Sequence, residues 1–258
     1  MEHKRYNVVR LYKVGNCYKL VGFKHSIREN IEKSQFKGQK NSKKLENNVK
    51  RAKSVIFELA FCNKWEFFCT FTIDGSKFSR NDLKSFYKSF SKFINNWSQR
   101  KSVVKYLLIP ELHSDNENWH LHGLVKGLPL CYLSPFERGK HPQRLVDGGY
   151  LNWGACSSRF GFCSLAPVRN SEAVSKYVTK YITKELLSQS REVGCHLYYC
   201  SKGLDRKQLK ADVSMVEMDI FDFDYENEYV KVKTVEESEV EKIYEFMRLL
   251  SIEPLRHC

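Results

Sequence analysis

His120 and His122 are the first residues whose types and spacing indicate chemistry. They lie in WHLHGLVKGL (119–128), a segment whose composition predicts a β-strand. Because successive side chains of a strand point to opposite faces, both imidazoles are expected on one face. Glu111 lies on the preceding predicted strand, across the turn HSDNEN, and is placed to add a carboxylate. The three side chains predict a two-histidine, one-carboxylate metal site with open coordination positions.

The histidine pair also has a structural interpretation. In a His-x-His pattern one imidazole can make a structural hydrogen bond while the other is simply exposed to solvent. His113 is a rival third ligand for a metal, although it is expected just beyond the end of its strand. The pair therefore needs a second feature before it indicates an enzyme.

That second feature is SKYVTKYITKE (175–185), which has the apolar spacing of a helix. Tyr177 and Tyr181 are one helical turn apart, at the border between the expected core face and the solvent face. Lys180 and Lys184 lie beyond the tyrosines. A phenol can act as a nucleophile when a Lewis acid polarises the electrophile and cations stabilise the developing charge. The alternative is an ordinary amphipathic helix with aromatic edges.

The elements around these residues alternate in type along the chain. The pattern predicts a strand at 65–74, a helix at 79–99, strands at 103–112 and 119–128, a strand within 154–168 and a helix at 171–187. This order indicates an α+β fold, a central antiparallel sheet backed by helices on one face. The aromatic residues of the helix at 79–99 have core spacing and are not expected to stack on bases.

The ends of the chain give weaker signals. Residues 1–35 could form a hairpin that turns near Gly15 and Asn16, and residues 43–59 form a basic amphipathic helix that could contact duplex or hairpin DNA. A short helix is expected at 236–250. We predict three parts: a basic N-terminal extension (1–60), a catalytic domain (61–210) and an acidic C-terminal tail (211–258).

The charge of the chain is distributed unevenly. The formal net charge is +13, but residues 211–258 hold 13 acidic and 5 basic side chains, whereas residues 1–210 hold 38 basic and 17 acidic ones. A body this basic indicates a polyanionic partner, most commonly nucleic acid, because each neutralised phosphate releases counterions.

The remaining composition excludes several classes of protein. No apolar run approaches the roughly 20 residues needed to span a bilayer, so no membrane partner is expected, and the cytoplasm is the expected compartment. Nine cysteines without a C-x-x-C pattern are typical of free thiols. A zinc site would need irregular spacing, and we weighed it only for Cys131, Cys156, Cys163, Cys195 and Cys200.

The order of these features resembles the HUH endonuclease superfamily, and more closely the rolling-circle replication initiators of small plasmids and single-stranded DNA phages. The first family motif, an apolar strand, is matched by FCTFTID (68–74), and the second by His120-Leu121-His122. The third is a helix with one or two tyrosines followed by lysine, matched by YVTKYITK (177–184). The resemblance covers roughly residues 50–205, including HLYYCSKGL (196–204), and implies an RRM-like palm.

The resemblance also implies a reaction. In it, Mg²⁺ or Mn²⁺ held by His120, His122 and Glu111 polarises the scissile phosphate of single-stranded DNA. A tyrosine attacks, giving a 5′-phosphotyrosine link and a free 3′-OH that primes a polymerase. Tyr177 and Tyr181 would alternate, so that the second closes the displaced strand into a circle.

The resemblance gives the two lysines and the partners their expected roles. Lys180 and Lys184 would stabilise the pentavalent phosphate or position it. The substrate would be single-stranded DNA at an origin hairpin, in the cytoplasm of a bacterial host. No G-x-x-x-x-G-K-[ST] occurs, so unwinding is expected to need a host helicase, and synthesis a host polymerase.

Three other functions fit the same residues. A transposase or conjugative relaxase of the same superfamily would share the chemistry and differ in its DNA partner. A non-catalytic nucleic-acid-binding protein would use the histidines structurally. A metal-dependent phosphoesterase would use water as its nucleophile, with the tyrosines merely packing.

Overall fold

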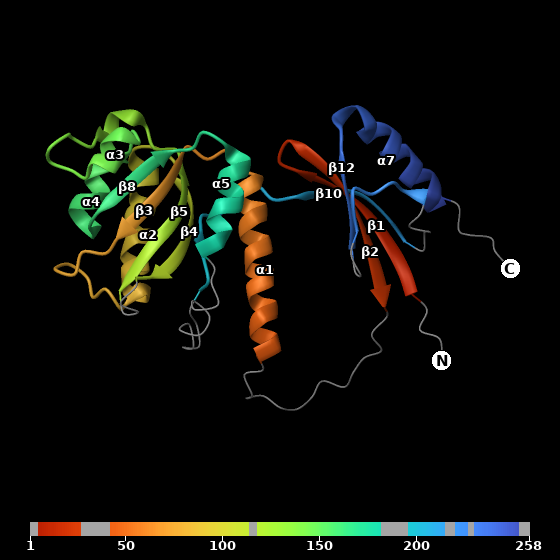
Figure 1. Cartoon of the computed structure of the whole chain (residues 1–258), viewed down its shortest axis with the longest axis horizontal. Coiled ribbons are helices and arrows are strands. Elements are labelled where there is room, and N and C mark those ends of the chain that lie inside the picture. The colour runs from red at the N-terminus through yellow and green to blue at the C-terminus, as the bar shows by residue number, and fades with distance from the viewer. Residues whose placement is uncertain are drawn as a thin grey trace. The chain divides into compact units, whose positions relative to one another are not determined.

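The structure, a computed structural model, describes residues 5–26, 42–113, 118–181, 196–214, 220–226 and 230–252. The fold is α+β, with antiparallel sheets and helices packed on them, as the sequence predicts. The chain divides into two compact units (Figure 1). The first contains Met1–Gln39 and Asp205–Cys258, and the second contains Lys40–Leu204.

The second unit is built on a seven-stranded antiparallel sheet. Its strands run in the order β6-β7-β8-β3-β5-β4-β9. Their bounds are β3 (Phe67–Thr72), β4 (Lys105–Leu112), β5 (Trp119–Lys126), β6 (Ser134–Pro135), β7 (Leu151–Asn152), β8 (Cys163–Pro167) and β9 (Tyr199–Cys200). The helices are α1 (Ser42–Phe61), α2 (Leu83–Arg100), α3 (Gln143–Asp147), α4 (Gly154–Phe160) and α5 (Ser171–Val178), with 3-10 turns η1 (Leu130–Tyr132) and η2 (Thr179–Tyr181).

Helices cover both faces of this sheet, which corrects the expectation of helices on one face only. On one face Phe86 and Phe90 of α2 share a core with Leu121 of β5. On the other face α1 and α5 contribute to a second core, which contains Leu107 and Ile109 of β4 (Figure 1). Consecutive residues of β4 thus enter opposite cores. The unbroken apolar run of β4 is the sequence signal of a strand buried on both faces.

Helix α2 shows why the local signals were reliable. Its N-cap residue, Asp82, accepts a hydrogen bond from the Ser85 backbone N–H at 3.0 Å. The residues buried on one side of the helix have helical spacing and enter the aromatic core: Leu83, Phe86, Phe90 and Ile94. The prediction that these aromatics form core is confirmed.

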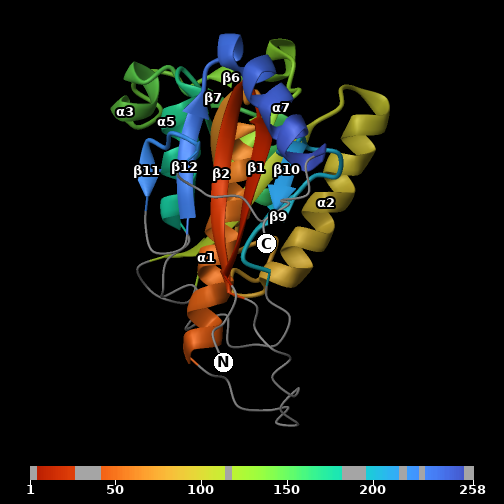
Figure 2. The ribbon, with the colours of Figure 1, turned by 90° about the vertical axis from the view of Figure 1, so that its right-hand side faces the viewer.

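The first unit is a five-stranded antiparallel sheet in the order β10-β1-β2-β12-β11 (Figure 2). Its elements are β1 (Arg5–Val14), β2 (Cys17–Ser26), β10 (Gln208–Ser214), β11 (Tyr225–Glu226), β12 (Val230–Val235) and α7 (Glu237–Ile252). Gly15 has a φ of 62° in the turn between β1 and β2, so the predicted hairpin and its turn are present. Met247 of α7 is fully buried against Val9 and Leu11 of β1 and their neighbours in this sheet.

This division differs from the three predicted parts. Residues 1–60 are not one extension, because the hairpin belongs to the first unit and α1 to the second. Residues 211–258 are not a separate tail, since β10 pairs with β1 and β12 pairs with β2. Local composition does not record such pairing between distant segments. The first unit holds 17 basic and 17 acidic residues, and the second holds 26 and 13, so the whole excess of +13 lies in the second unit.

Gly123 controls how closely β4 and β5 approach. A Cβ added to it would lie 1.9 Å from the Leu107 carbonyl oxygen of β4. We therefore expect Gly123→Ala to force the two strands apart and to lower the free energy of unfolding by about 1–3 kcal/mol. Urea unfolding followed by circular dichroism measures this change.

The matched control is Gly154→Ala, because a Cβ there meets no atom within 4 Å. We expect this variant to be neutral or slightly stabilised. Equal unfolding midpoints for Gly123→Ala and the wild type would contradict the close-approach argument.

Candidate active site

The register of β5 places both histidines on one face of the second unit's sheet. The ring centroids of His120 and His122 are 6.3 Å apart and their planes differ by only 14°. Leu121 points to the opposite face, where it is fully buried in the aromatic core. The alternation expected from the sequence therefore holds at the level of geometry.

Two threonines of β3 hold these imidazoles in place. Thr70 lies opposite His122 and Thr72 opposite His120 in the β3–β5 pairing. Each threonine Oγ1 is 3.0 Å from the Nδ1 atom of its histidine. These hydrogen bonds orient the rings and direct each Nε2 away from β3. The sequence analysis did not single out the threonines, although their spacing of two in TFT was a visible signal.

Glu111 is brought to the same place by β4. It lies opposite His120 in the pairing, and its Oε2 atom is 2.8 Å from Nε2 of His122. This hydrogen bond to His122 lowers the pKa of the Glu111 carboxyl, so the ionised form is favoured. Partial burial, followed by the charges of His113 and His122, lowers the pKa of His120 and favours the neutral imidazole. Ionised carboxylate and neutral imidazole are the forms that bind metal ions.

The donor set fits a divalent cation in chemistry and partly in spacing. Two ligand atoms at right angles on a Mg²⁺ ion, each about 2.1 Å away, lie about 3 Å apart. Glu111 Oε2 and His122 Nε2 are already at nearly this separation. Among the described residues, however, no three His, Cys, Asp or Glu side chains converge as a complete ligand set. His120 must therefore turn toward the other two to act as the third ligand.

His113 lies beside this group. β4 ends at Leu112, so His113 follows the strand, as expected. Its ring stacks on that of His120 with centroids 5.0 Å apart. It is thus a neighbour of His120, and the rival assignment as a ligand is not tested by the geometry.

The tyrosines are carried by α5 and the turn that follows it. Asn170 caps α5 by accepting a hydrogen bond from the Ala173 backbone N–H, as the sequence indicates. The α-helix ends at Val178, and Thr179–Tyr181 form a 3-10 turn. The rest of the predicted helix, including Lys184, lies outside the described residues.

The tyrosine pair and the histidine pair meet. The Tyr181 ring stacks on the His122 ring, with centroids 4.4 Å apart and planes 12° apart. The Tyr181 hydroxyl donates to the Tyr177 hydroxyl at 3.0 Å. Phe68 of β3 packs against both tyrosine rings and against His122. Residues predicted from two separate motifs therefore form one cluster.

The two phenols have different environments. Tyr177 is 43% exposed, whereas Tyr181 is 9% exposed. Partial burial and the hydrogen bond to Tyr177 raise the pKa of Tyr181 above its ordinary value. Burial also acts to raise the pKa of Tyr177, but the interactions with Lys180 and Tyr181 outweigh it and lower that pKa. The phenolate form is thus more accessible at Tyr177.

Lys180 is the cation closest to this pair among the described residues. Its Nζ atom is 3.6 Å from the centroid of the Tyr177 ring and 5.4 Å from that of Tyr181. Lys176, one turn earlier, instead forms an ion pair with Glu172 at 2.7 Å. The two lysines therefore have different partners, and Lys180 is the one that stabilises negative charge on Tyr177.

Comparison with known protein families gives one match. Residues 66–186 match the family of the replication-associated protein ORF2. The matched segment is slightly less than half of the chain and contains Glu111, both histidines and both tyrosines. This match supports a replication initiator family and a role in replication initiation. Searches of curated proteins and of solved structures found no match.

The helices were also examined for membrane-spanning character. Within the described ranges, none combines the length and the apolar composition that crossing a bilayer requires.

The environment of Tyr177 generates a prediction that does not depend on function. We expect Lys180→Gln to raise the pKa of Tyr177, because the nearby ammonium stabilises the phenolate. Ultraviolet titration of tyrosinate absorbance measures this shift, and loss of the same titration step in Tyr177→Phe assigns it.

Lys176→Gln is the matched control, because it removes one charge from the same helix without removing the neighbour of Tyr177. An unchanged tyrosine titration in Lys180→Gln would show that the lysine does not act on this phenol.

Proposed function

We propose that this chain is a rolling-circle replication initiator that nicks and rejoins single-stranded origin DNA through a 5′-phosphotyrosine intermediate. The observation that carries the proposal is the contact between the two motifs. The ring of Tyr181 lies on that of His122, and its hydroxyl bonds to Tyr177. A nucleophile pair beside a metal-ligand set is what phosphoryl transfer to tyrosine requires. The family match of this segment supports the role in replication.

His120, His122 and Glu111 would hold the divalent cation, Mg²⁺ or Mn²⁺. When bound, such a cation supplies Lewis-acid polarisation of the scissile phosphate. The protein's own contribution is to orient the ligands. Thr70 and Thr72 fix the imidazoles through Nδ1, which leaves each Nε2 for the cation.

We assign the first attack to Tyr177. Its hydroxyl is the more exposed of the two, and its pKa is lowered by Lys180 and Tyr181 against the effect of burial. The phenolate oxygen forms a bond to phosphorus while the bond from phosphorus to the 3′ oxygen breaks. The 3′ oxygen takes up a proton and becomes the 3′-OH that primes synthesis.

Tyr181 would act in the second half of the reaction. Burial raises its pKa, so it remains protonated and donates to Tyr177 while the first strand is cut. After one round of synthesis it would attack the regenerated site, and the released strand would close into a circle. Lys180 would stabilise charge on the transferred phosphate. Lys184 keeps the same proposed role, although it lies outside the described residues.

The proposed partners follow from this role. Single-stranded DNA at an origin hairpin is the substrate, and a host helicase and a host polymerase would unwind and copy the replicon in the cytoplasm of a bacterium. The excess of basic residues in the second unit, 26 against 13 acidic ones, favours such a substrate. A transposase or relaxase with the same chemistry would differ in the DNA that it cuts.

A denaturing gel tests the proposal. The protein is incubated with Mn²⁺ and a single-stranded oligonucleotide carrying the origin of its own replicon. We expect a denaturation-resistant protein–DNA adduct, and mass spectrometry should locate it on Tyr177. Tyr177→Phe should slow the first cut more than Tyr181→Phe, and the double variant should form no adduct.

Each alternative gives a different gel. Binding without cleavage would indicate a non-catalytic nucleic-acid-binding protein, and cleavage without an adduct would indicate a phosphoesterase that uses water. An adduct that persists in the double variant would overturn the assignment of the tyrosines.

The threonines give a separate prediction about the metal. Replacing Thr70 and Thr72 with Val keeps the shape of the side chains and removes the hydrogen bonds to the imidazoles. We expect Mn²⁺ affinity, measured by calorimetry, to fall about 10–100-fold. DNA binding without metal should be little changed.

Thr179→Val is the matched control, because the hydroxyl of Thr179 donates to the Lys176 carbonyl instead. Unchanged Mn²⁺ affinity in the Thr70/Thr72 variant would argue that the histidines do not hold a cation in this orientation.

A further inference from the structure

Arg80 lies beside the candidate active site and has no role in the mechanism above. It is an exposed residue of the loop between β3 and α2. Its Nε–H donates to the carbonyl of Ile73, the residue after β3, at 3.0 Å. Within the described ranges this is the one hydrogen bond of its side chain, and it forms no ion pair there. The outer nitrogens of the guanidinium remain available.

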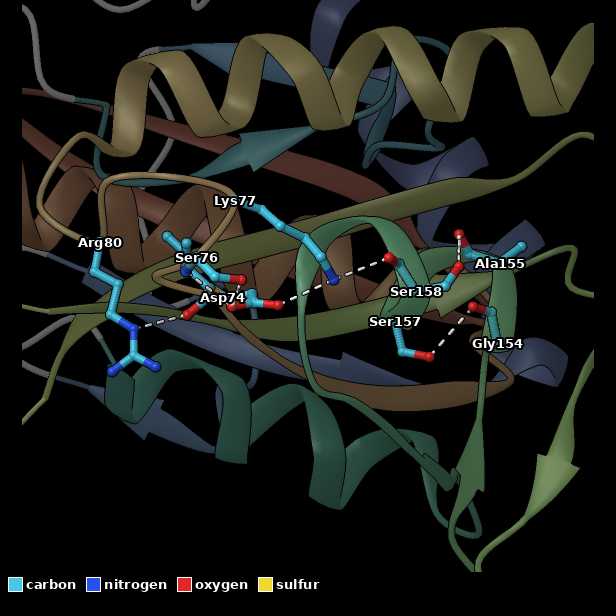
Figure 3. A network of polar contacts seen from close by, with 9 residues as sticks. Asp74, Ser76, Lys77, Arg80, Gly154, Ala155, Ser157 and Ser158 are labelled. Carbon is cyan, nitrogen blue, oxygen red and sulfur yellow. Dashed lines mark hydrogen bonds and ion pairs between the residues drawn. The ribbon is translucent and has the colours of Figure 1, made fainter.

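The loop that carries Arg80 is held by its own polar contacts (Figure 3). Asp74 accepts hydrogen bonds from the backbone N–H and the hydroxyl of Ser76 and forms an ion pair with Lys77 at 3.0 Å. These contacts, with Lys77 and Ser76 the main causes, lower the pKa of Asp74 to about 2. Lys77 also donates to the carbonyl of Ser158 in α4. The loop is therefore ordered without any contribution from the charge of Arg80.

The two cations of this loop differ in what they can bind. Lys77 already has a carboxylate and a carbonyl as partners. In Figure 3 the outer nitrogens of Arg80 point away from the pair formed by Asp74 and Lys77. Arg80 is thus the cation of the loop that is ready to bind an anion. A guanidinium anchored at Nε presents its remaining N–H groups in a fixed plane, which suits a phosphate.

The backbone fixes the position of Arg80 relative to the histidines. Its carbonyl oxygen accepts a hydrogen bond from the N–H of Trp119, the residue before His120, at 3.1 Å. Arg80 therefore lies at the end of β5 where the His120 side chain begins the polar row. His122, which contacts Tyr181, lies two residues further along the strand. A chain that runs along this row would reach the tyrosines at one end and Arg80 at the other.

We propose that Arg80 binds a phosphate of single-stranded DNA next to the phosphate that is cut. This proposal rests on the proposed function, because the cut defines the neighbouring phosphate. Arg80 is a positioning residue here: it holds the strand in register with His120, His122 and the tyrosines and does not touch the reacting atoms.

The first test measures the salt dependence of binding to a twelve-residue oligothymidine without metal. Loss of one phosphate contact lowers the slope of log K against log salt concentration by about 0.7 for a single strand. We expect this decrease in Arg80→Gln. Arg80→Lys should keep the slope, because it keeps the charge, but should bind more weakly, because it lacks the planar donors.

Lys88→Gln is the matched control for charge. Lys88 is an exposed residue of α2, which packs on the face of the sheet opposite the histidines. We expect its salt slope to equal that of the wild type. An unchanged slope in Arg80→Gln, or an equal decrease in Lys88→Gln, would overturn the proposal. Far-ultraviolet circular dichroism of each variant verifies the fold.

The second test locates the phosphate. Oligonucleotides that form the adduct are prepared with one neutral methylphosphonate at each position near the cut. The wild type should lose about tenfold or more in affinity at one flanking position, and Arg80→Gln should be insensitive at that position alone. An adduct with no position that depends on Arg80 would refute this inference and leave the proposed function intact. An Arg80-dependent salt slope without any adduct would do the reverse.

Discussion

The antiparallel register of β3, β5 and β4 is the constraint on which the candidate site depends. It aligns Thr72, His120 and Glu111 in one row across the sheet, and it places Thr70 beside His122 in the next row. Because backbone hydrogen bonds set the spacing of adjacent strands at about 4.8 Å, side chains from three strands come within hydrogen-bonding reach. A shift of one residue in any pair would send its polar side chains into the opposite core. Gly123 lets β4 approach β5 closely enough for this alignment.

The two faces of the sheet do different work. One face carries the aromatic core with α2, which makes the strands rigid. The other is apolar where α1 and α5 cover it and polar toward one end, where the histidines and Glu111 lie. Tyr181 belongs to both regions, because its ring is part of the apolar core and its hydroxyl bonds to Tyr177. This dual position gives the two phenols their opposite pKa shifts.

The distribution of charge follows the division into units. The second unit holds the entire net positive charge, and the first is neutral overall, with 17 residues of each sign. The sequence analysis assigned a strongly basic body and an acidic tail, because it divided the chain at residue 210. In the structure, the acidic C-terminal segment and the basic N-terminal hairpin form one sheet. Attraction to nucleic acid is therefore expected of the unit that contains the candidate site.

The sequence by itself determined the features that depend on neighbouring residues. The period of two put His120 and His122 on one face, the helical period put the aromatics of α2 in the core, and Asn170 and Gly15 marked a cap and a turn. Only the tertiary structure brought Tyr181 onto His122, 59 positions away in the chain, selected the threonines as imidazole partners and joined the two ends of the chain in one sheet. The reason is physical. Local periodicity is set by backbone geometry over a few residues, whereas contacts between distant segments depend on which arrangement buries the apolar surface of the whole chain.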